Sequence, residues 1–333
     1  MQHADLLTKV ISNVHKPLSV DPGVDILLAT YNGQSYLGQL LLSLTQQSHT
    51  NWQLLVSDDN SSDGTAVLLN NFSKLNPEKV TILPRNQQSL GACQNFARLI
   101  RESRQDYIMF CDQDDVWLPD KIALTLKKIL EAEANKGKNF PMMVFTDLVL
   151  TDSRNNEIAK SFWKYEHIDP NRVELKNLLV QNVSTGCTIM SNRALIDIVN
   201  VMPQAAIVHD WWLALLASSF GALIPLGSQT MHYRQHEGNC IGASRWSLLN
   251  KVRDIVTLSK FIKTYRATFN LTYAQTDSFL SLYRNNLTSD QIDILTKYVK
   301  LASSPWLGKR VSIVNNRFFR YGLVRKFAQF LFM

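Results

Sequence analysis

Apolar runs and helical leucine patterns alternate along the first 150 residues. Short apolar runs bounded by turn residues predict buried strands, and apolar residues spaced three or four apart predict helices. The expected strands are 24–29, 52–56, 80–83, 107–111 and 142–150. The expected helices between them are 37–44, 67–72, 90–100 and 118–134. This alternation predicts an α/β fold, with a mostly parallel central sheet flanked by helices on both faces in a Rossmann-like manner.

The regular alternation ends after Leu150. Residues 151–170 are polar and aromatic, which predicts a loop over a cleft. The remaining expected elements are a helix over 173–180, a strand hinged at Gly186 over 183–190, an apolar helix over 206–218, and short strands over 222–226 and 230–234. From Ser244 onward the pattern is helical, with a dip near Pro305.

Charge is distributed unevenly along the chain. The net charge is +7, yet the segment 244–333 alone carries 15 Lys and Arg against 4 Asp and Glu. This asymmetry predicts an anionic partner for the C-terminal part. The first 22 residues do not have the pattern of a secretory signal, and no apolar run reaches 18 residues, so we expect a cytoplasmic protein.

Three carboxylates directly follow the apolar run 107–111. They are Asp112, Asp114 and Asp115, and they stand where a buried strand meets a helix. Ligands bind at this end of the strands in open α/β sheets. Asp112 and Asp114 are close enough to share a hard cation such as Mg²⁺, which also takes water and phosphate oxygens. The pattern predicts a metal site and a phosphate-bearing substrate; the alternative is a polar turn with helix-capping acids.

Two earlier strand ends carry possible partners of this cluster. Tyr31 follows the first strand and could stack on a flat base, and Asp59 follows the second and could accept a hydrogen bond from a base imide. Neither a GxxxxGK[ST] loop nor a GxGxxG turn occurs in the sequence. With no glycine cradle, a metal would have to hold the phosphates.

At these motifs the chain resembles family 2 glycosyltransferases of the GT-A fold. The matching segments are 29–33, 57–65 and 112–121, and the segments 209–212 and 233–236 are similar to rhamnosyltransferase-type members. The resemblance implies an N-terminal extension (1–22), a GT-A catalytic domain (23–243) and a basic helical region (244–333). Within the catalytic domain, 23–120 would bind the nucleotide and 121–243 the acceptor.

The resemblance also implies roles for individual residues. Asp210 would be the general base at the start of a helix, although an acid there also suits the helix dipole. Asp112, Asp114 and His236 would bind Mg²⁺ or Mn²⁺, although a lone loop histidine is usually just solvated. Acceptor contacts would come from Gly186, Trp211 and Trp212, with core packing as the alternative for the two tryptophans. The residues implied for nucleotide binding are Thr30, Tyr31, Asn32, Asp59, Asp112 and Gln113.

The implied activity is inverting transfer of a single sugar from a nucleotide-sugar donor. The donor would be dTDP-rhamnose or, as the second choice, a UDP-hexose. The acceptor would be a glycan or polyprenyl-linked oligosaccharide of a bacterial surface polysaccharide. One base and one metal on opposite sides of the anomeric carbon suffice for displacement with inversion. A retaining hydrolase would instead need two carboxylates that flank the bond. A non-catalytic GT-A module that binds a glycan or a protein partner is the rival from another class.

The segment 305–333 carries six basic residues, no acidic residue and seven aromatic residues. Basic residues interleaved with bulky apolar ones on a helical pattern are typical of a helix on an anionic membrane surface. Such a protein would lie on the cytoplasmic face of the inner membrane. The alternative is a basic helix packed on the catalytic domain. A nucleic-acid partner is not expected, since no nucleic-acid-binding motif accompanies the charge.

Overall fold

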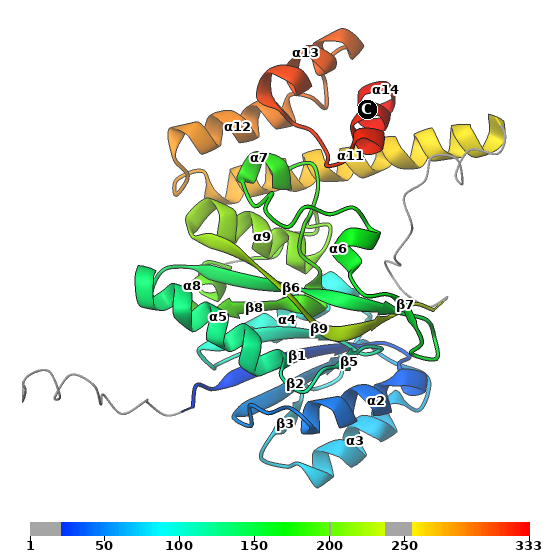
Figure 1. Cartoon of the computed structure of the whole chain (residues 1–333), viewed down its shortest axis with the longest axis vertical. Coiled ribbons are helices and arrows are strands. Elements are labelled where there is room, and N and C mark those ends of the chain that lie inside the picture. The colour runs from blue at the N-terminus through cyan, green and yellow to red at the C-terminus, as the bar shows by residue number, and fades with distance from the viewer. Residues whose placement is uncertain (1–20, 200, 237–254) are drawn as a thin grey trace, which may run out of the picture.

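The computed structural model describes residues 21–199, 201–236 and 255–333. They form one nine-stranded sheet with helices on both sides and a tier of helices at one end (Figure 1). The strands are β1 (Val24–Thr30), β2 (Trp52–Asp58), β3 (Val80–Ile82), β4 (Tyr107–Asp112), β5 (Val116–Trp117), β6 (Met142–Thr151), β7 (Glu157–Ala159), β8 (Ile189–Asn192) and β9 (Ala222–Arg234).

Helices alternate with these strands in the first half and dominate the last eighty residues. In chain order they are α2 (Gln34–Thr45), α3 (Thr65–Leu75), α4 (Ala92–Glu102), α5 (Lys121–Lys136), α6 (Phe162–Tyr165), α7 (Leu175–Leu178), the 3-10 helix η1 (Gly186–Thr188), α8 (Arg193–Ile196), α9 (His209–Phe220), α11 (Ile255–Tyr283), α12 (Ser289–Val299), α13 (Trp306–Asn316) and α14 (Leu323–Phe332).

The strand order across the sheet is β3-β2-β1-β4-β8-β6-β9-β5, with β7 paired to β6. β1, β2, β3 and β4 are joined by parallel pairing. β2 and β4 lie on opposite sides of β1, so the direction of strand addition reverses there. In open α/β sheets ligands bind outside the carboxyl ends of the strands at such a reversal. The ends of β1 and β4 are therefore where a site is expected.

The predicted helical layers on both faces are confirmed, as β1 illustrates. Its Ile26 and Leu28 pack into a core with side chains of α2 and α5, whereas Leu27 packs into the other core with α4 and α9. Successive side chains of a strand point to opposite faces. A continuous apolar run therefore corresponds to a strand that is buried on both sides.

Three predictions of local structure were wrong after residue 150. The strand expected over 183–190 begins only at Ile189, because η1 makes a tight turn before it, and it pairs antiparallel with both β4 and β6. The two strands expected over 222–234 are one strand, β9, whose register shift against β6 absorbs the residues around Gly227. The expected loop over 151–170 contains β7 and α6.

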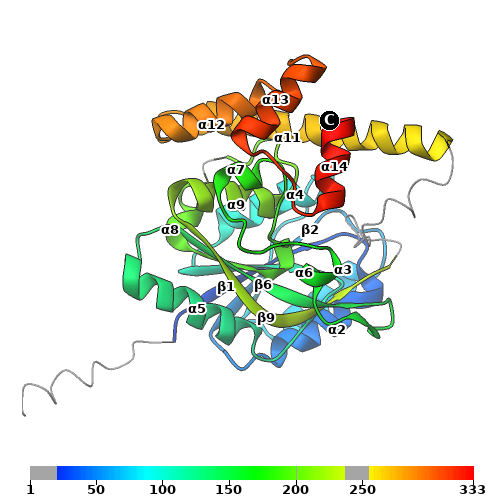
Figure 2. The ribbon, with the colours of Figure 1, turned by 45° about the horizontal axis from the view of Figure 1, so that its top comes forward.

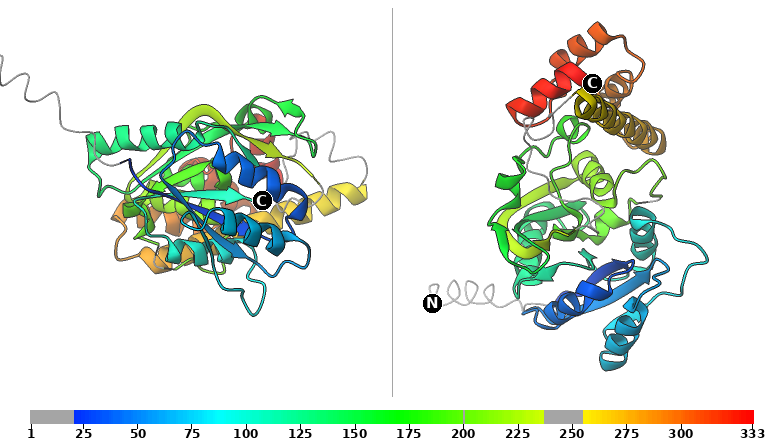
Figure 3. Two further views of the ribbon diagram at one scale, coloured as in Figure 1. Left: turned by 90° about the horizontal axis from the view of Figure 1, so that it is seen from below. Right: turned by 90° about the vertical axis from the view of Figure 1, so that its right-hand side faces the viewer.

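Helices α11 to α14 form the terminal tier, which rests on α7 and α9 (Figures 1 and 2). The right-hand view of Figure 3 places this tier at the end of the molecule away from β1 and β2. Among the residues that the structure describes, no helix is long and apolar enough to cross a bilayer. Residues 1–20 of the expected N-terminal extension, and the expected boundary at 243/244, lie outside the described residues.

Candidate functional site

The ends of β1 and β4 are tied together by Gln113. Its side chain accepts a hydrogen bond from the backbone N–H of Tyr31 and donates one to the Tyr31 carbonyl oxygen, each at 2.8 Å. A Cβ on Gly33 would lie 2.3 Å from Gln113 Oε1, so a larger residue there would displace this side chain. The backbone of Tyr31 is thus held while its ring is 56% exposed. An exposed ring on a fixed backbone suits stacking on a base.

Thr30 and Asn32 shape the same loop. The hydroxyl of Thr30 donates to Asp58 Oδ1 at 2.9 Å, which links the ends of β1 and β2. Asn32 adopts a left-handed conformation, with φ of 49°, and its Oδ1 accepts a hydrogen bond from the backbone N–H of Ser62 at 2.8 Å. Their side chains therefore hold the loop around the site, and direct nucleotide contact by them stays a prediction.

Asp59 orders the loop that precedes α4. Its buried carboxylate accepts hydrogen bonds from the Ser89 hydroxyl at 2.7 Å and from the backbone N–H groups of Leu90 and Gly91 at 2.7 and 2.9 Å. Both carboxylate oxygens are thus already engaged by protein donors. A hydrogen bond from a base imide would use the remaining acceptor capacity of Asp59, and that contact stays a prediction.

Asp114 and His236 meet although 122 residues separate them in the sequence. Nε2 of His236 lies 2.8 Å from Asp114 Oδ2, and the imidazole stacks on Tyr36 with ring centroids 4.5 Å apart. Arg234 donates to the Asp114 carbonyl oxygen at 2.9 Å, and its guanidinium lies 4.8 Å from the centroid of the Tyr36 ring. Arg234 and His236, at and just after the end of β9, thus hold the loop that follows β4.

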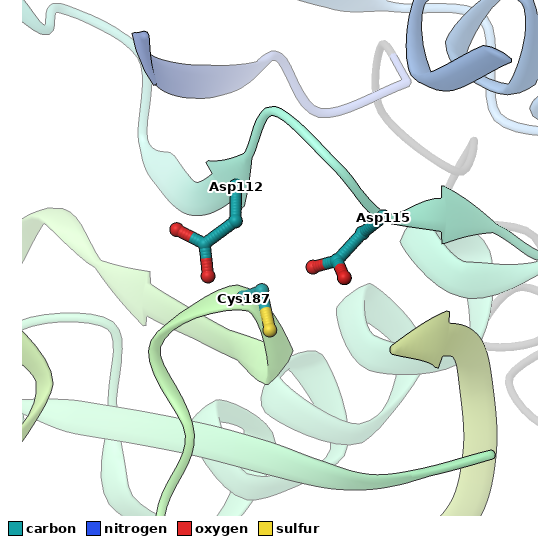
Figure 4. Close-up of side chains that lie close together, drawn as sticks. All are labelled: Asp112, Asp115 and Cys187. Carbon is teal, nitrogen blue, oxygen red and sulfur yellow. The ribbon is translucent and has the colours of Figure 1, made fainter. Parts of the chain in front are cut away.

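A buried cluster lies beneath this loop. Figure 4 shows the carboxylates of Asp112 and Asp115 close to the thiol of Cys187, and one ligand atom of each lies within 4.8 Å of the others. Burial, and then the charges of the two carboxylates, raise the pKa of Cys187 well above its ordinary value. The thiol therefore stays protonated beside the two carboxylates.

The donor set at the end of β4 fits a hard divalent cation. Burial raises the pKa of Asp112 to about 7, and the negative charges of Asp114 and Asp210 add to the effect. Clustered carboxylates are costly unless a cation offsets their charge. Asp112, Asp114 and His236 offer the oxygen and imidazole ligands that suit Mg²⁺ or Mn²⁺. Asp115 is fully buried, so it is poorly placed to share an ion with water and phosphate.

Asp210 lies at the start of α9, within electrostatic range of Asp112. Its Oδ1 accepts a hydrogen bond from the backbone N–H of Trp211 at 2.6 Å, and its carboxylate accepts another from the backbone of Gly186. Burial raises the pKa of Asp210 to about 7. A carboxyl with a pKa near the working pH is well suited to take a proton from a substrate hydroxyl.

Gly186 packs against the side chain of His209, the residue before Asp210. A Cβ on Gly186 would lie 2.8 Å from both Cε1 and Nε2 of His209, and 3.6 Å from Asp210 Oδ2. The imidazole of His209 packs against Phe96 and Phe110, with centroid distances of 4.0 and 5.0 Å. Burial lowers its pKa to about 3, so His209 is neutral. Gly186 therefore sets the approach of η1 to Asp210.

The acceptor role expected for the two tryptophans was wrong. Trp212 is fully buried and packs edge-to-face on Phe279 of α11 at 5.4 Å. Trp211 is also buried, and its indole N–H donates to the Leu178 carbonyl oxygen at 2.6 Å. Stacking on a sugar needs an exposed ring face. Core packing, the alternative reading, explains both residues, because α11 covers the outer side of α9.

Three residues of the site were missed or misread from the sequence. No role of its own was predicted for Asp115, yet it is buried together with Trp117, and the i, i+2 spacing of the two residues was the available signal. Lys121 is also fully buried, on the same helical face as Thr125, and burial lowers its pKa to about 8. Arg234 lies in the segment 233–236, but no role was predicted for it.

Sequence comparisons agree with this site. The sequence profile described as "Glycosyl transferase family 2" matches residues 25–199. The dTDP-rhamnosyl transferase RfbG of Shigella flexneri is 29% identical over 228 residues, covering 65% of this chain and 74% of that protein. The UDP-Glc:alpha-D-GlcNAc-diphosphoundecaprenol beta-1,3-glucosyltransferase WfgD of Escherichia coli is 24% identical over 234 residues, covering 70% and 85%.

Solved structures share the fold. TarS 1–349 of S. aureus in complex with UDP-GlcNAc superimposes with a TM-score of 0.51 at 14% identity, covering 89% of both chains. The mannosyltransferase PcManGT from Pyrobaculum calidifontis, in complex with GDP-Man and Mn²⁺, gives a TM-score of 0.50 at 15% identity, covering 99% of this chain and 95% of that one. At these identities the likeness shows the GT-A fold alone.

Proposed function

The chain belongs to glycosyl transferase family 2, and from that premise we propose that it is an inverting, metal-dependent glycosyltransferase. It transfers L-rhamnose from dTDP-rhamnose to a glycan or polyprenyl-linked oligosaccharide during assembly of a bacterial surface polysaccharide. The observation that carries the proposal is the placement of Asp210, at the start of α9, within electrostatic range of Asp112 at the carboxyl end of β4, although these two residues are far apart in the sequence.

Asp210 is the general base in this proposal. An acceptor hydroxyl gives its proton to the Asp210 carboxylate as its oxygen attacks the anomeric carbon. The bond from that carbon to the diphosphate breaks on the opposite side, which inverts the configuration. The hydrogen bonds from Gly186 and Trp211 orient the carboxylate, and its raised pKa makes it a stronger base than an exposed aspartate.

The donor lies across the ends of β1 and β4 in this proposal. The Tyr31 ring stacks on the base, and Asp112, Asp114 and His236 hold Mg²⁺ or Mn²⁺. An ion held by these residues would supply positive charge to the leaving diphosphate. Residues 23–120 then form the nucleotide-binding half of the catalytic domain and 121–243 the acceptor half, with 244–333 as an added helical region.

The choice of donor follows the Shigella relative, whose name gives dTDP-rhamnosyl transfer. The Escherichia relative favours a second candidate, because its name gives UDP-Glc as donor and a diphosphoundecaprenol-linked acceptor. Competition between dTDP-rhamnose and UDP-glucose for the purified protein separates the two candidates.

The experiment that tests the proposal is product formation by the Asp210→Asn variant. Wild-type protein, Mn²⁺ and dTDP-rhamnose are incubated with lipid-linked oligosaccharide acceptors, and the product is measured by mass spectrometry. We expect Asp210→Asn to lower the transfer rate by about 100-fold or more, as loss of a general base does. Nucleotide binding by this variant should be unchanged.

Asp120→Asn is the matched control, because Asp120 is an exposed acid whose side chain makes no capping hydrogen bond at the start of α5. It should transfer at the wild-type rate. Transfer by Asp210→Asn at the wild-type rate would exclude Asp210 as the base. The absence of transfer with every nucleotide sugar, even with wild-type protein, would favour a non-catalytic binding module.

A further inference from the structure

Helix α14 is amphipathic, but its polar side faces the protein and its apolar side faces outward. The residues that it buries are Arg325, Ala328 and Gln329, whereas its bulky apolar side chains face outward. Leu323 is 83% exposed and Phe327 is 61% exposed. A helix on a globular protein normally buries its apolar side and exposes its polar side. In this orientation the apolar side of α14 is available to contact a binding partner.

Specific polar contacts hold α14 in this orientation. Arg325 lies 3.3 Å from Glu166 Oε2 and donates to the His167 carbonyl oxygen at 2.9 Å. Gln329 donates to the Phe318 carbonyl oxygen at 2.6 Å and accepts from the Arg320 backbone N–H at 2.9 Å. Rotating the helix to bury Leu323 and Phe327 would break all four interactions.

Helix α13 repeats the arrangement. It buries Ile313 and also Arg310, whose guanidinium donates to the carbonyl oxygens of Phe330, Leu331 and Met333 at 2.9–3.0 Å and so caps the end of α14. Four large apolar side chains of α13 are exposed: Trp306, Leu307, Val311 and Val314. Together with the exposed side chains of α14 they form what we call the α13–α14 surface.

Basic residues accompany this surface without acidic ones. Arg317 and Lys326 are exposed, Lys309 and Arg320 are half-buried, and the sequence from 305 to 333 contains no Asp or Glu. The pKa of Lys309 is lowered, first by burial and then by the positive charges of Arg310 and Arg266. At Lys309, the positive charges of described residues therefore lie close to one another.

We propose that the α13–α14 surface binds the surface of an anionic lipid bilayer. Bulky apolar side chains can insert at the boundary between headgroups and acyl chains, while Arg317 and Lys326 contact the acidic headgroups. A second copy of the chain fits less well, because a symmetric contact would bring the same positive charges face to face. This inference does not depend on the proposed glycosyl transfer.

Vesicle flotation with the full chain tests the proposal. Vesicles of phosphatidylethanolamine and phosphatidylglycerol should carry the wild-type protein, and vesicles of phosphatidylcholine alone should carry much less. High salt should weaken binding, since it screens the headgroups. Arg317→Ala with Lys326→Ala should lower the partition coefficient about 25-fold, at roughly fivefold for each cation near the surface.

The decisive comparison places two apolar-to-Glu substitutions either on α14 or, as the control, on α3. Leu323→Glu with Phe327→Glu should abolish flotation. Val67→Glu with Leu75→Glu should not, because these side chains of α3 are similarly exposed, at 62% and 81%, but lie away from the α13–α14 surface. Circular dichroism checks that both variants stay folded.

Light scattering of the protein in solution tests whether a second copy of the chain binds the α13–α14 surface instead. A monomer that floats with anionic vesicles would support the proposal. A wild-type dimer that Leu323→Glu with Phe327→Glu converts to a monomer, with no flotation on any vesicle, would overturn it in favour of self-association. Equal flotation of all the variants, or equal binding to phosphatidylcholine, would also overturn it.

Discussion

Gly186→Ala is a substitution that the packing around the proposed base constrains tightly. The new Cβ would lie 2.8 Å from two ring atoms of His209, whereas ordinary carbon contacts are about 3.5–4.0 Å. The imidazole must therefore move by roughly 1 Å, yet Phe96 and Phe110 pack against it and limit that movement. Asp210 adjoins His209 in the chain, so the displacement reaches the proposed base.

Two effects of Gly186→Ala follow. Overpacking of a tight core should lower the free energy of unfolding by about 1–3 kcal/mol, measured by urea denaturation. A misplacement of about 1 Å at the reacting groups should lower kcat about 100-fold. Nucleotide binding should stay near the wild-type value, because Asp114 and His236 come from other elements.

Gly38→Ala is the matched control, since nothing lies within 4 Å of a Cβ added at Gly38 in α2. It should keep the wild-type kcat and stabilise the helix slightly. In the double variant, His209→Ala should relieve part of the cost of Gly186→Ala, which a double-mutant cycle measures. Wild-type stability and wild-type kcat in Gly186→Ala would refute the reasoning.

Three further perturbations test other parts of the account. Burial raises the pKa of Asp210 to about 7, and only the ionised carboxylate takes a proton, so kcat should fall as pH drops below about 7; a flat pH profile would contradict this. Trp212→Ala should cost about 3–5 kcal/mol of unfolding free energy in urea, and a loss below about 1 kcal/mol would contradict its core position. Lys121→Met leaves Asp115 buried without its neighbouring cation, so it should cost roughly 3 kcal/mol by thermal denaturation, and an unchanged melting temperature would argue against that charge balance.

The sequence predicted the nucleotide-binding half of the fold well, for a physical reason. β1, β2 and β4 are largely apolar runs that each end in polar residues, and parallel strands bring those ends to one edge of the sheet. Asp114 and His236, which the resemblance assigned to one metal site, lie in contact at 2.8 Å. Local patterns and one topological rule were enough for this part.

Later elements depended on contacts between distant segments, which local patterns do not reveal. The insertion of β8 between β4 and β6 follows from pairing across the sheet. The burial of Trp212 follows from the docking of α11, and the inverse orientation of α14 follows from its ion pair with Glu166. The two alternatives for 305–333 were packing and a membrane surface; α14 packs through its polar side and leaves its apolar side outward.

Metal-dependent nucleotide binding tests the central claim most directly. Melting temperatures would be measured with dTDP, UDP, GDP and CMP, each with and without Mn²⁺, for wild-type protein, Asp114→Asn and the control Asp120→Asn. A saturating ligand should raise the melting temperature by about 5 °C. We predict this shift for dTDP with Mn²⁺ in the wild type and the control, and its loss in Asp114→Asn. No shift with any nucleotide, or an equal shift in all three proteins without metal, would contradict the account.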